Sequence, residues 1–262
     1  MAAIPTNPAL DLSAVAGGLD PALGHALDSG VAAAALGGAH GQGEADAVTG
    51  LSGLPEHELL SHEERRVPHA GRHRIVLIRH GQPHIALRPR TKRDGFARYM
   101  DQYEEAGLHP DSDPPAELRA LLAELAPSLR QVFASNRPRA FESAARLLPH
   151  LPRVIEPEFA EAPLPAPPLP GVTLRVAKWA VLARIFWHAG YHPGIENPAE
   201  ARARAQDAAT RLMEQARDSG AAVLVAHGYF NYMIGRALRA HGFSRTGSHR
   251  ATFWNCVVYD KG

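Results

Sequence analysis

Between residue 73 and residue 262, short runs of β-branched and aliphatic residues alternate with segments of helical spacing. The predicted strands are 75–78, 131–134, 153–155, 221–226 and 253–259. The predicted helices are 114–129, 138–148, 172–189, 197–219 and 231–241. Strands that alternate with helices of this length are typical of a mostly parallel sheet covered on both faces. The predicted fold class is therefore α/β, a three-layer α/β/α sandwich.

The segment before this domain has a different composition. Residues 1–64 hold nine acidic residues and no lysine or arginine, and they are rich in alanine and glycine. Such a segment buries too little apolar surface to offset the entropy of ordering it. We expect residues 1–70 to be a mostly disordered acidic extension with a short helix at 56–66, and residues 71–262 to be the α/β domain. The extension is either a dispensable tail or a cover drawn to the basic domain.

Composition limits the cellular location and the classes of binding partner to be expected. Cys256 is the single cysteine, which excludes an internal disulfide and a cysteine metal site. No run of 18 apolar residues is present, and the first 30 residues carry no lysine or arginine. We therefore expect a cytoplasmic protein that has no membrane partner, no metal and no cofactor. Basic runs interleaved with aromatic residues are absent, so no nucleic-acid partner is expected.

Two predicted strands end in histidine followed by glycine. Arg79, His80 and Gly81 follow the first strand, and His227 follows the strand at 221–226. Ligands of open α/β sheets bind beyond the carboxyl ends of the strands. Arg139 enters the same edge at a helix start, where a helix N-terminus and a guanidinium favour an anion. Two histidines and at least two arginines at one edge predict a phosphate pocket that contains a nucleophile.

Three segments carry a resemblance to a known family. "IVLIRHGQP", "FASNRPRAFESAARLL" and "VLVAHGYFNYMIGRAL" resemble, in order, the three motifs of the histidine phosphatase superfamily, the phosphoglycerate-mutase-like proteins. The resemblance covers nearly all of residues 73–262. It implies that His80 is a nucleophile that becomes a phosphohistidine, and that Arg79, Gly81, Arg139 and His227 bind the phosphoryl group.

The resemblance also implies a catalytic acid that protonates the leaving group. The family usually places it after the third strand, where this chain has Glu156, Glu158 and Glu161. We select Glu161 because it lies farthest from the strand and opens a proline-rich segment, and we keep Glu158 as the second candidate. His227 counts with His80 and Glu161 among the catalytic residues.

The chain departs from the family pattern after Gly81. The family more often has threonine or serine two residues after the glycine and an asparagine later, whereas this chain has Pro83, His84 and Ala86. We therefore do not count on a secondary phosphate contact at these positions, whereas the departure leaves the assignment of the nucleophile unchanged. In the second motif, Arg137 is either a further phosphate contact or a surface residue.

The segment from Pro83 to Pro115 is the most basic run of the chain, with Arg88, Arg90, Lys92, Arg93 and Arg98. It is interpreted either as a cover over a polyanionic or sugar-phosphate substrate or as a solvated arm. The apolar helix at 172–189 either packs on the domain or forms a homodimer face or a lid.

The sequence therefore predicts a metal-independent phosphomonoester hydrolase that acts on a small phosphorylated metabolite. The alternatives are a mutase-like phosphotransferase, a protein phosphatase and a non-catalytic module that binds phosphorylated ligands.

Overall fold

A computed structural model of the chain describes residues 71, 73–86, 90–250 and 252–262. The predicted acidic extension, including the helix at 56–66, lies outside these residues, and so does Arg88. No helix in the described part of the chain has the length and apolarity needed to span a bilayer.

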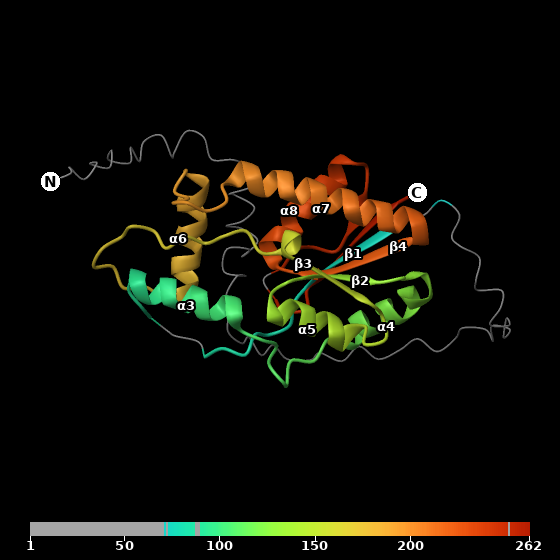
Figure 1. The fold of residues 1–262 in the computed structure, drawn as a ribbon, viewed down its shortest axis with the longest axis horizontal. Coiled ribbons are helices and arrows are strands. Elements are labelled where there is room, and N and C mark those ends of the chain that lie inside the picture. Colours follow the sequence, from blue (N-terminus) through green and yellow to red (C-terminus); the bar gives the residue numbers. More distant parts are fainter. Residues whose placement is uncertain (1–70, 72, 87–89, 251) are drawn as a thin grey trace, which may run out of the picture.

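A six-stranded sheet of order β3-β2-β4-β1-β6-β5 forms the centre of the domain (Figure 1). Its strands are β1 (His73–Arg79), β2 (Val132–Ser135), β3 (Arg153–Glu156), β4 (Ala221–Ala226), β5 (Ser244–Thr246) and β6 (Cys256–Lys261). Strands β1 to β4 pair in parallel, whereas β6 pairs antiparallel with β1 and with β5. The mostly parallel sheet is confirmed.

Helices cover both faces of this sheet (Figure 1). Ile75 and Leu77 of β1 pack with α7 (Pro198–Ser219) and α8 (Gly228–Ala240). Val76 and Ile78 pack on the opposite face with α4 (Ala116–Leu125) and α5 (Pro138–Leu147). Successive side chains of a strand point to opposite faces, so an unbroken aliphatic run is typical of a strand buried on both sides. The three-layer α/β/α prediction is confirmed.

A third apolar cluster lies beside the sandwich. Helix α3 (Arg93–Glu105) packs on α6 (Val176–His188), with the rings of Phe96 and Trp179 stacked at 5.8 Å between centroids. Figure 1 shows both helices set off from the sheet. The basic segment between Pro83 and Pro115 was not predicted to contain a helix, and it contributes α3.

Most predicted element ends agree with the structure to within a few residues. Asn197 caps α7 in a capping box with Glu200, and Gly220 ends it at φ 84°. Two short 3-10 turns, Ala126–Ser128 and Pro157–Phe159, follow α4 and β3. The larger differences are at α6, which begins four residues after the predicted start, at α8, which begins three residues before it, and at β6, which spans Cys256–Lys261 instead of 253–259.

Candidate active site

The ends of β1 and β4 bring two histidines together. The two strands are parallel neighbours, with Arg79 opposite Ala226, so the residues that follow them leave the sheet at the same edge. His80 and His227 lie there with ring centroids 5.2 Å apart. Each is 1% exposed. The predicted convergence of the two strand ends is therefore present.

Arg139 links the two imidazoles. It lies in the first turn of α5 and is fully buried. Its Nε donates to His80 Nε2 at 3.3 Å, and its Nη2 lies 3.5 Å from His227 Nδ1. Its Nη1 donates to the Tyr103 carbonyl oxygen at 2.6 Å. The guanidinium is thus held by α3 while it faces both histidines.

These contacts fix the tautomer of each imidazole. A guanidinium can only donate, so His80 Nε2 and His227 Nδ1 act as acceptors toward Arg139. The other nitrogen of each ring then carries the proton. His80 Nδ1 donates to the Gly81 carbonyl oxygen at 2.7 Å, and His227 Nε2 donates to Ser135 Oγ at 2.8 Å. The lone pair of His80 Nε2 therefore faces the guanidinium side of the site.

Burial keeps both rings neutral. It lowers the pKa of His80 and of His227 well below the ordinary value of 6.5, and the nearby positive charge of Arg139 lowers both further. Burial also lowers the pKa of Arg79, whose guanidinium lies over the Phe253 ring at 4.8 Å. An arginine nevertheless remains cationic at neutral pH. The site therefore joins two neutral imidazoles to fixed positive charge.

Glu161 lies against the N-terminus of α8. Its carboxylate accepts the backbone N–H groups of Ala162 at 3.0 Å, Tyr229 at 3.2 Å and Phe230 at 2.9 Å. Two of these donors belong to the first turn of a helix, where N–H groups have no partner within the helix. Glu161 thereby accepts N–H groups of the first turn of α8. This helix begins three residues before its predicted start.

The two candidate acids are separated by the fold. Glu158 Oε2 binds Arg211 Nη1 of α7 at 3.0 Å, and Glu158 does not line the cavity that holds His80. Glu161 does line that cavity. Of the two candidate acids, Glu161 is therefore the one that lies in the same cavity as His80, and its role as the acid stays a prediction.

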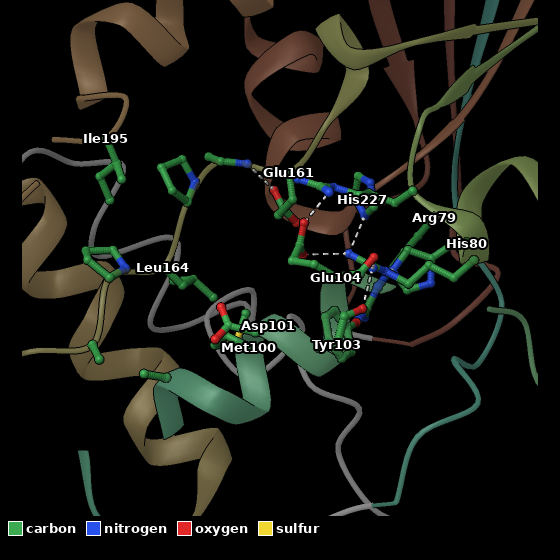
Figure 2. Close-up of a pocket in the computed structure, with 17 residues that line it drawn as sticks. Arg79, His80, Met100, Asp101, Tyr103, Glu104, Glu161, Leu164, Ile195 and His227 are labelled. Carbon is green, nitrogen blue, oxygen red and sulfur yellow. Dashed lines mark hydrogen bonds and ion pairs between the residues drawn. The ribbon is translucent and has the colours of Figure 1, made fainter. Parts of the chain in front are cut away.

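A cavity of about 360 Å³ joins these groups (Figure 2). Its charged part is lined by Arg79, His80, Arg139, Glu161 and His227, and its other part is lined mainly by apolar residues. The residues of that second part include Met100, Leu164, Pro165, Ala166 and Ile195. Figure 2 shows Leu164 and Ile195 on the side away from Arg79 and His80. The cavity thus has room for a phosphoryl group and a small, partly apolar remainder.

Helix α3 supplies lining residues that the sequence reasoning missed. Glu104 forms ion pairs with Arg139 Nη2 at 3.1 Å and with Arg137 Nε at 2.6 Å, and Tyr103 lies next to it. The available signal was the helical spacing of Phe96, Tyr99 and Tyr103, which marks a face to be buried.

The described basic residues of the segment from Pro83 to Pro115 lie away from the cavity. Arg90, Lys92, Arg93 and Arg98 do not line the cavity, whereas Asp101 does. The segment therefore does cover the site, but α3 covers it with apolar, aromatic and acidic side chains. Of the two interpretations of this segment, a basic cover over a polyanionic substrate has no support among its described residues, because none of their basic side chains lines the cavity. Arg137 lines the cavity, so it is placed to contact a ligand instead of lying only at the surface.

The arrangement is suited to binding and attacking an anion. Guanidinium groups give planar paired contacts to phosphoryl oxygens, and the unprotonated nitrogen of a neutral imidazole can act as a nucleophile. Gly81 N–H, which donates to Ser143 Oγ at 2.9 Å, holds the loop that carries His80. In the described part of the chain, no group of three or more His, Cys, Asp or Glu side chains is placed to hold a metal ion.

Comparison with known proteins identifies similar structures and one family. No curated protein matches the chain. A mycobacterial glucosyl-3-phosphoglycerate phosphatase is 20% identical over 64% of this chain and 79% of that chain, with a TM-score of 0.42. A phosphoserine phosphatase from Entamoeba histolytica is 12% identical over 71% and 89%, with a TM-score of 0.43. An ecdysone phosphate phosphatase from Bombix mori is 14% identical over 71% and 88%, with a TM-score of 0.45. The sequence model of the histidine phosphatase superfamily (branch 1) matches residues 75–262.

Proposed function

Because the chain belongs to the histidine phosphatase superfamily (branch 1), we propose that it is a phosphomonoester hydrolase that uses His80 as its nucleophile. The observation that carries the proposal is the tautomer of His80. Its Nδ1–H is bound to the Gly81 carbonyl oxygen, which leaves the Nε2 lone pair on the side of Arg139. The family match and the resemblance of the three motifs support the same assignment.

In the first step, His80 Nε2 attacks phosphorus and the bond between phosphorus and the ester oxygen breaks. The phosphoryl group is then bonded to Nε2, and the imidazole becomes cationic. The Gly81 carbonyl oxygen, 2.7 Å from Nδ1, stabilises that positive charge. Arg79, Arg139 and His227 bind the phosphoryl oxygens, where fixed donors stabilise the spread negative charge of the transition state. Arginine charge thus supplies the electrostatic stabilisation, and the reaction is proposed to need no metal.

The departing alcohol takes a proton from the Glu161 carboxyl group. In the second step a water molecule loses a proton to the Glu161 carboxylate and attacks phosphorus, the bond to Nε2 breaks, and inorganic phosphate leaves. His80 and Glu161 return to their starting states. Glu161 is proposed because it lines the same cavity as His80. The α8 N–H groups that it accepts favour its carboxylate, which is the form that takes the proton from water in the second step.

The proposed substrate is a small phosphate monoester with a partly apolar alcohol. The lining of the cavity supports this class, because Met100, Leu164 and Ile195 lie at the end away from the histidines. The basic residues Lys92 and Arg98 lie outside the lining, so neither is placed to bind a second phosphate group of a substrate in this cavity.

The test of nucleophilic catalysis uses p-nitrophenyl phosphate in EDTA, with wild type, His80→Ala and His84→Ala. His84 is a neighbouring exposed histidine that does not line the cavity that holds His80, so its variant is the matched control. We expect wild type and His84→Ala to form an acid-labile phosphoenzyme and to turn over, and His80→Ala to do neither. Turnover that survives in His80→Ala contradicts the proposal.

Two additional measurements, vanadate binding and phosphate exchange between isomeric esters, separate the alternative functions. A non-catalytic module would bind vanadate and release no phosphate. A mutase would exchange phosphate between isomeric esters with little free phosphate. Either result overturns the hydrolase assignment.

The role of Glu161 is tested with a series of leaving groups. Nitrophenolate leaves without a proton, whereas an alkoxide requires one. We expect Glu161→Gln to lower kcat/KM by about 10²-fold or more for an alkyl phosphate, and much less for p-nitrophenyl phosphate. Glu158→Gln is the control and should affect neither substrate. Equal losses of Glu161→Gln on both substrates exclude it as the acid and direct attention to Glu104.

A further inference from the structure

We propose that the Tyr103 hydroxyl is a further catalytic group, which donates a hydrogen bond to a phosphoryl oxygen of the bound substrate. This inference rests on the proposed function and names a residue of the same site. No motif of the family resemblance includes Tyr103, because it lies on α3, in the segment between the first and second motifs.

The ring of Tyr103 has a fixed position at the charged end of the cavity. Tyr103 is 4% exposed and lines the cavity. The Arg139 guanidinium carbon lies over its ring at 4.3 Å from the centroid, and its backbone oxygen accepts from Arg139 Nη1. The His80 ring meets it edge-on at 6.4 Å between centroids. Figure 2 shows Tyr103 beside Glu104 on the side of the cavity where Arg79 and His80 lie.

The hydroxyl of Tyr103 has a proton to donate. Its oxygen is buried, and in the part of the chain that the structure describes no carbonyl, carboxylate or other acceptor makes a hydrogen bond with it. The Arg79 side chain interacts with this hydroxyl. A guanidinium can only donate, so Arg79 can occupy an oxygen lone pair but not the hydroxyl proton. A buried donor without an acceptor is unfavourable, and a phosphoryl oxygen in the cavity would accept its proton.

The sequence around His80 explains why such a donor is needed. Where the family more often has a hydroxyl residue and then an asparagine, this chain has Pro83, His84 and Ala86. The side chains of Pro83 and Ala86 cannot donate a hydrogen bond, and His84 does not line the cavity that holds His80. A hydroxyl from α3 therefore supplies a donor that the loop after Gly81 lacks.

Tyr99 gives a matched control. It is 1% exposed, its hydroxyl is buried without a hydrogen-bond partner in the described structure, and its ring stacks on Tyr103 at 6.2 Å between centroids. Tyr99 does not line the cavity. Removing either hydroxyl leaves the aromatic packing of α3 in place, so only the position of the lost hydroxyl differs.

The experiment compares wild type, Tyr103→Phe and Tyr99→Phe by kcat/KM for p-nitrophenyl phosphate, by the inhibition constant of vanadate and by Tm. A hydrogen bond to a charged group corresponds to a change of about 10–100-fold. We expect Tyr103→Phe to lose that factor in kcat/KM and to bind vanadate more weakly by a similar factor, without a decrease in Tm. Tyr99→Phe should match wild type in kcat/KM and in vanadate inhibition.

Two results overturn the inference. The first is a Tyr103→Phe enzyme with wild-type kcat/KM and wild-type vanadate inhibition. The second is an equal loss in both phenylalanine variants, which would show that packing of α3 is responsible. Failure of the proposed function is a separate outcome, because it appears as wild-type turnover that does not depend on His80. Vanadate inhibition or binding would still report on the Tyr103 donor in that case.

Discussion

Substituting alanine for Gly81 would disturb both the packing and the chemistry of the site. A Cβ atom at Gly81 would lie 2.3 Å from Cζ2 and 2.6 Å from Cε2 of Trp254, and 2.6 Å from Cδ1 of Leu108. Ordinary contacts are 3.4–4 Å, so the surroundings must move by about 1 Å. Trp254 cannot move freely, because it is 6% exposed and its Nε1 donates to Ser112 Oγ at 3.0 Å.

The magnitude follows from these contacts. Overpacking of a core typically costs about 1–3 kcal/mol, and weakening the bond between Gly81 N–H and Ser143 Oγ adds about 1 kcal/mol. We therefore expect the free energy of unfolding of Gly81→Ala to fall by about 2–4 kcal/mol, which is a Tm decrease of about 5–15 °C. A shift of about 1 Å at the Gly81 carbonyl also misplaces His80, and we expect kcat/KM to fall by about 10²-fold.

The assay is thermal unfolding followed by circular dichroism, together with hydrolysis of p-nitrophenyl phosphate at a temperature where the variant is folded. Gly220→Ala is the control. Gly220 has φ 84° at the end of α7, next to the start of β4, and a Cβ there meets no atom within 4 Å. We expect Gly220→Ala to lose stability through backbone strain while keeping its activity.

Two outcomes refute this reasoning. If Gly81→Ala keeps both the Tm and the kcat/KM of wild type, Trp254 and Leu108 do not pack on Gly81 as the structure shows. If the variant loses stability but keeps full kcat/KM when folded, the Gly81 carbonyl does not determine the orientation of His80.

Three further predictions concern buried charge and pH. Arg184 is buried and donates to the carbonyl oxygens of Ala162 and Pro163. Arg184→Met should therefore lower the free energy of unfolding, measured in urea, by about 1–3 kcal/mol, and an unchanged urea midpoint would contradict this. The pKa of His80 is well below 6.5, so the nucleophile stays neutral in mild acid and the acid limb of kcat/KM should lie below pH 6.5; a limb at or above 6.5 contradicts the buried neutral imidazole. Burial lowers the pKa of His249 to about 4, so the unfolded chain binds more protons, and the urea midpoint should decrease as pH falls from about 6.5 toward 4. His249→Gln should reduce that slope, and a midpoint independent of pH would exclude this linkage.

Much of the sandwich could be predicted because its signals are local. The run at Ala221–Ala226 coincides with β4, and the capping residue Asn197 with the stop at Gly220 gives both ends of α7. Residues that follow parallel neighbouring strands must emerge at one edge. For this reason the meeting of His80 and His227 could be inferred before any distance was known.

The start of α8 and the course of the basic segment could not be predicted in this way. The first N–H groups of α8 are bound by Glu161, which is more than sixty residues away in the chain. Local patterns therefore placed the helix start too late. Helix α3 becomes a lining element because Phe96 packs on Trp179, a contact between distant segments that no short-range pattern reports.

The sequence by itself determined the layered sheet, the three family motifs and the presence of two histidines and Arg139 at one edge. Only the tertiary structure decided that Glu161 lines the cavity and that Glu158 does not, and that Tyr103 and Glu104 complete the charged end. The physical reason is the sequence separation of the interacting residues. Strand and helix signals, and the turns that follow them, depend on neighbours within a few residues. The cavity depends on how the apolar face of α3 packs on α6. That contact joins segments far apart in the sequence and forms only in the folded chain.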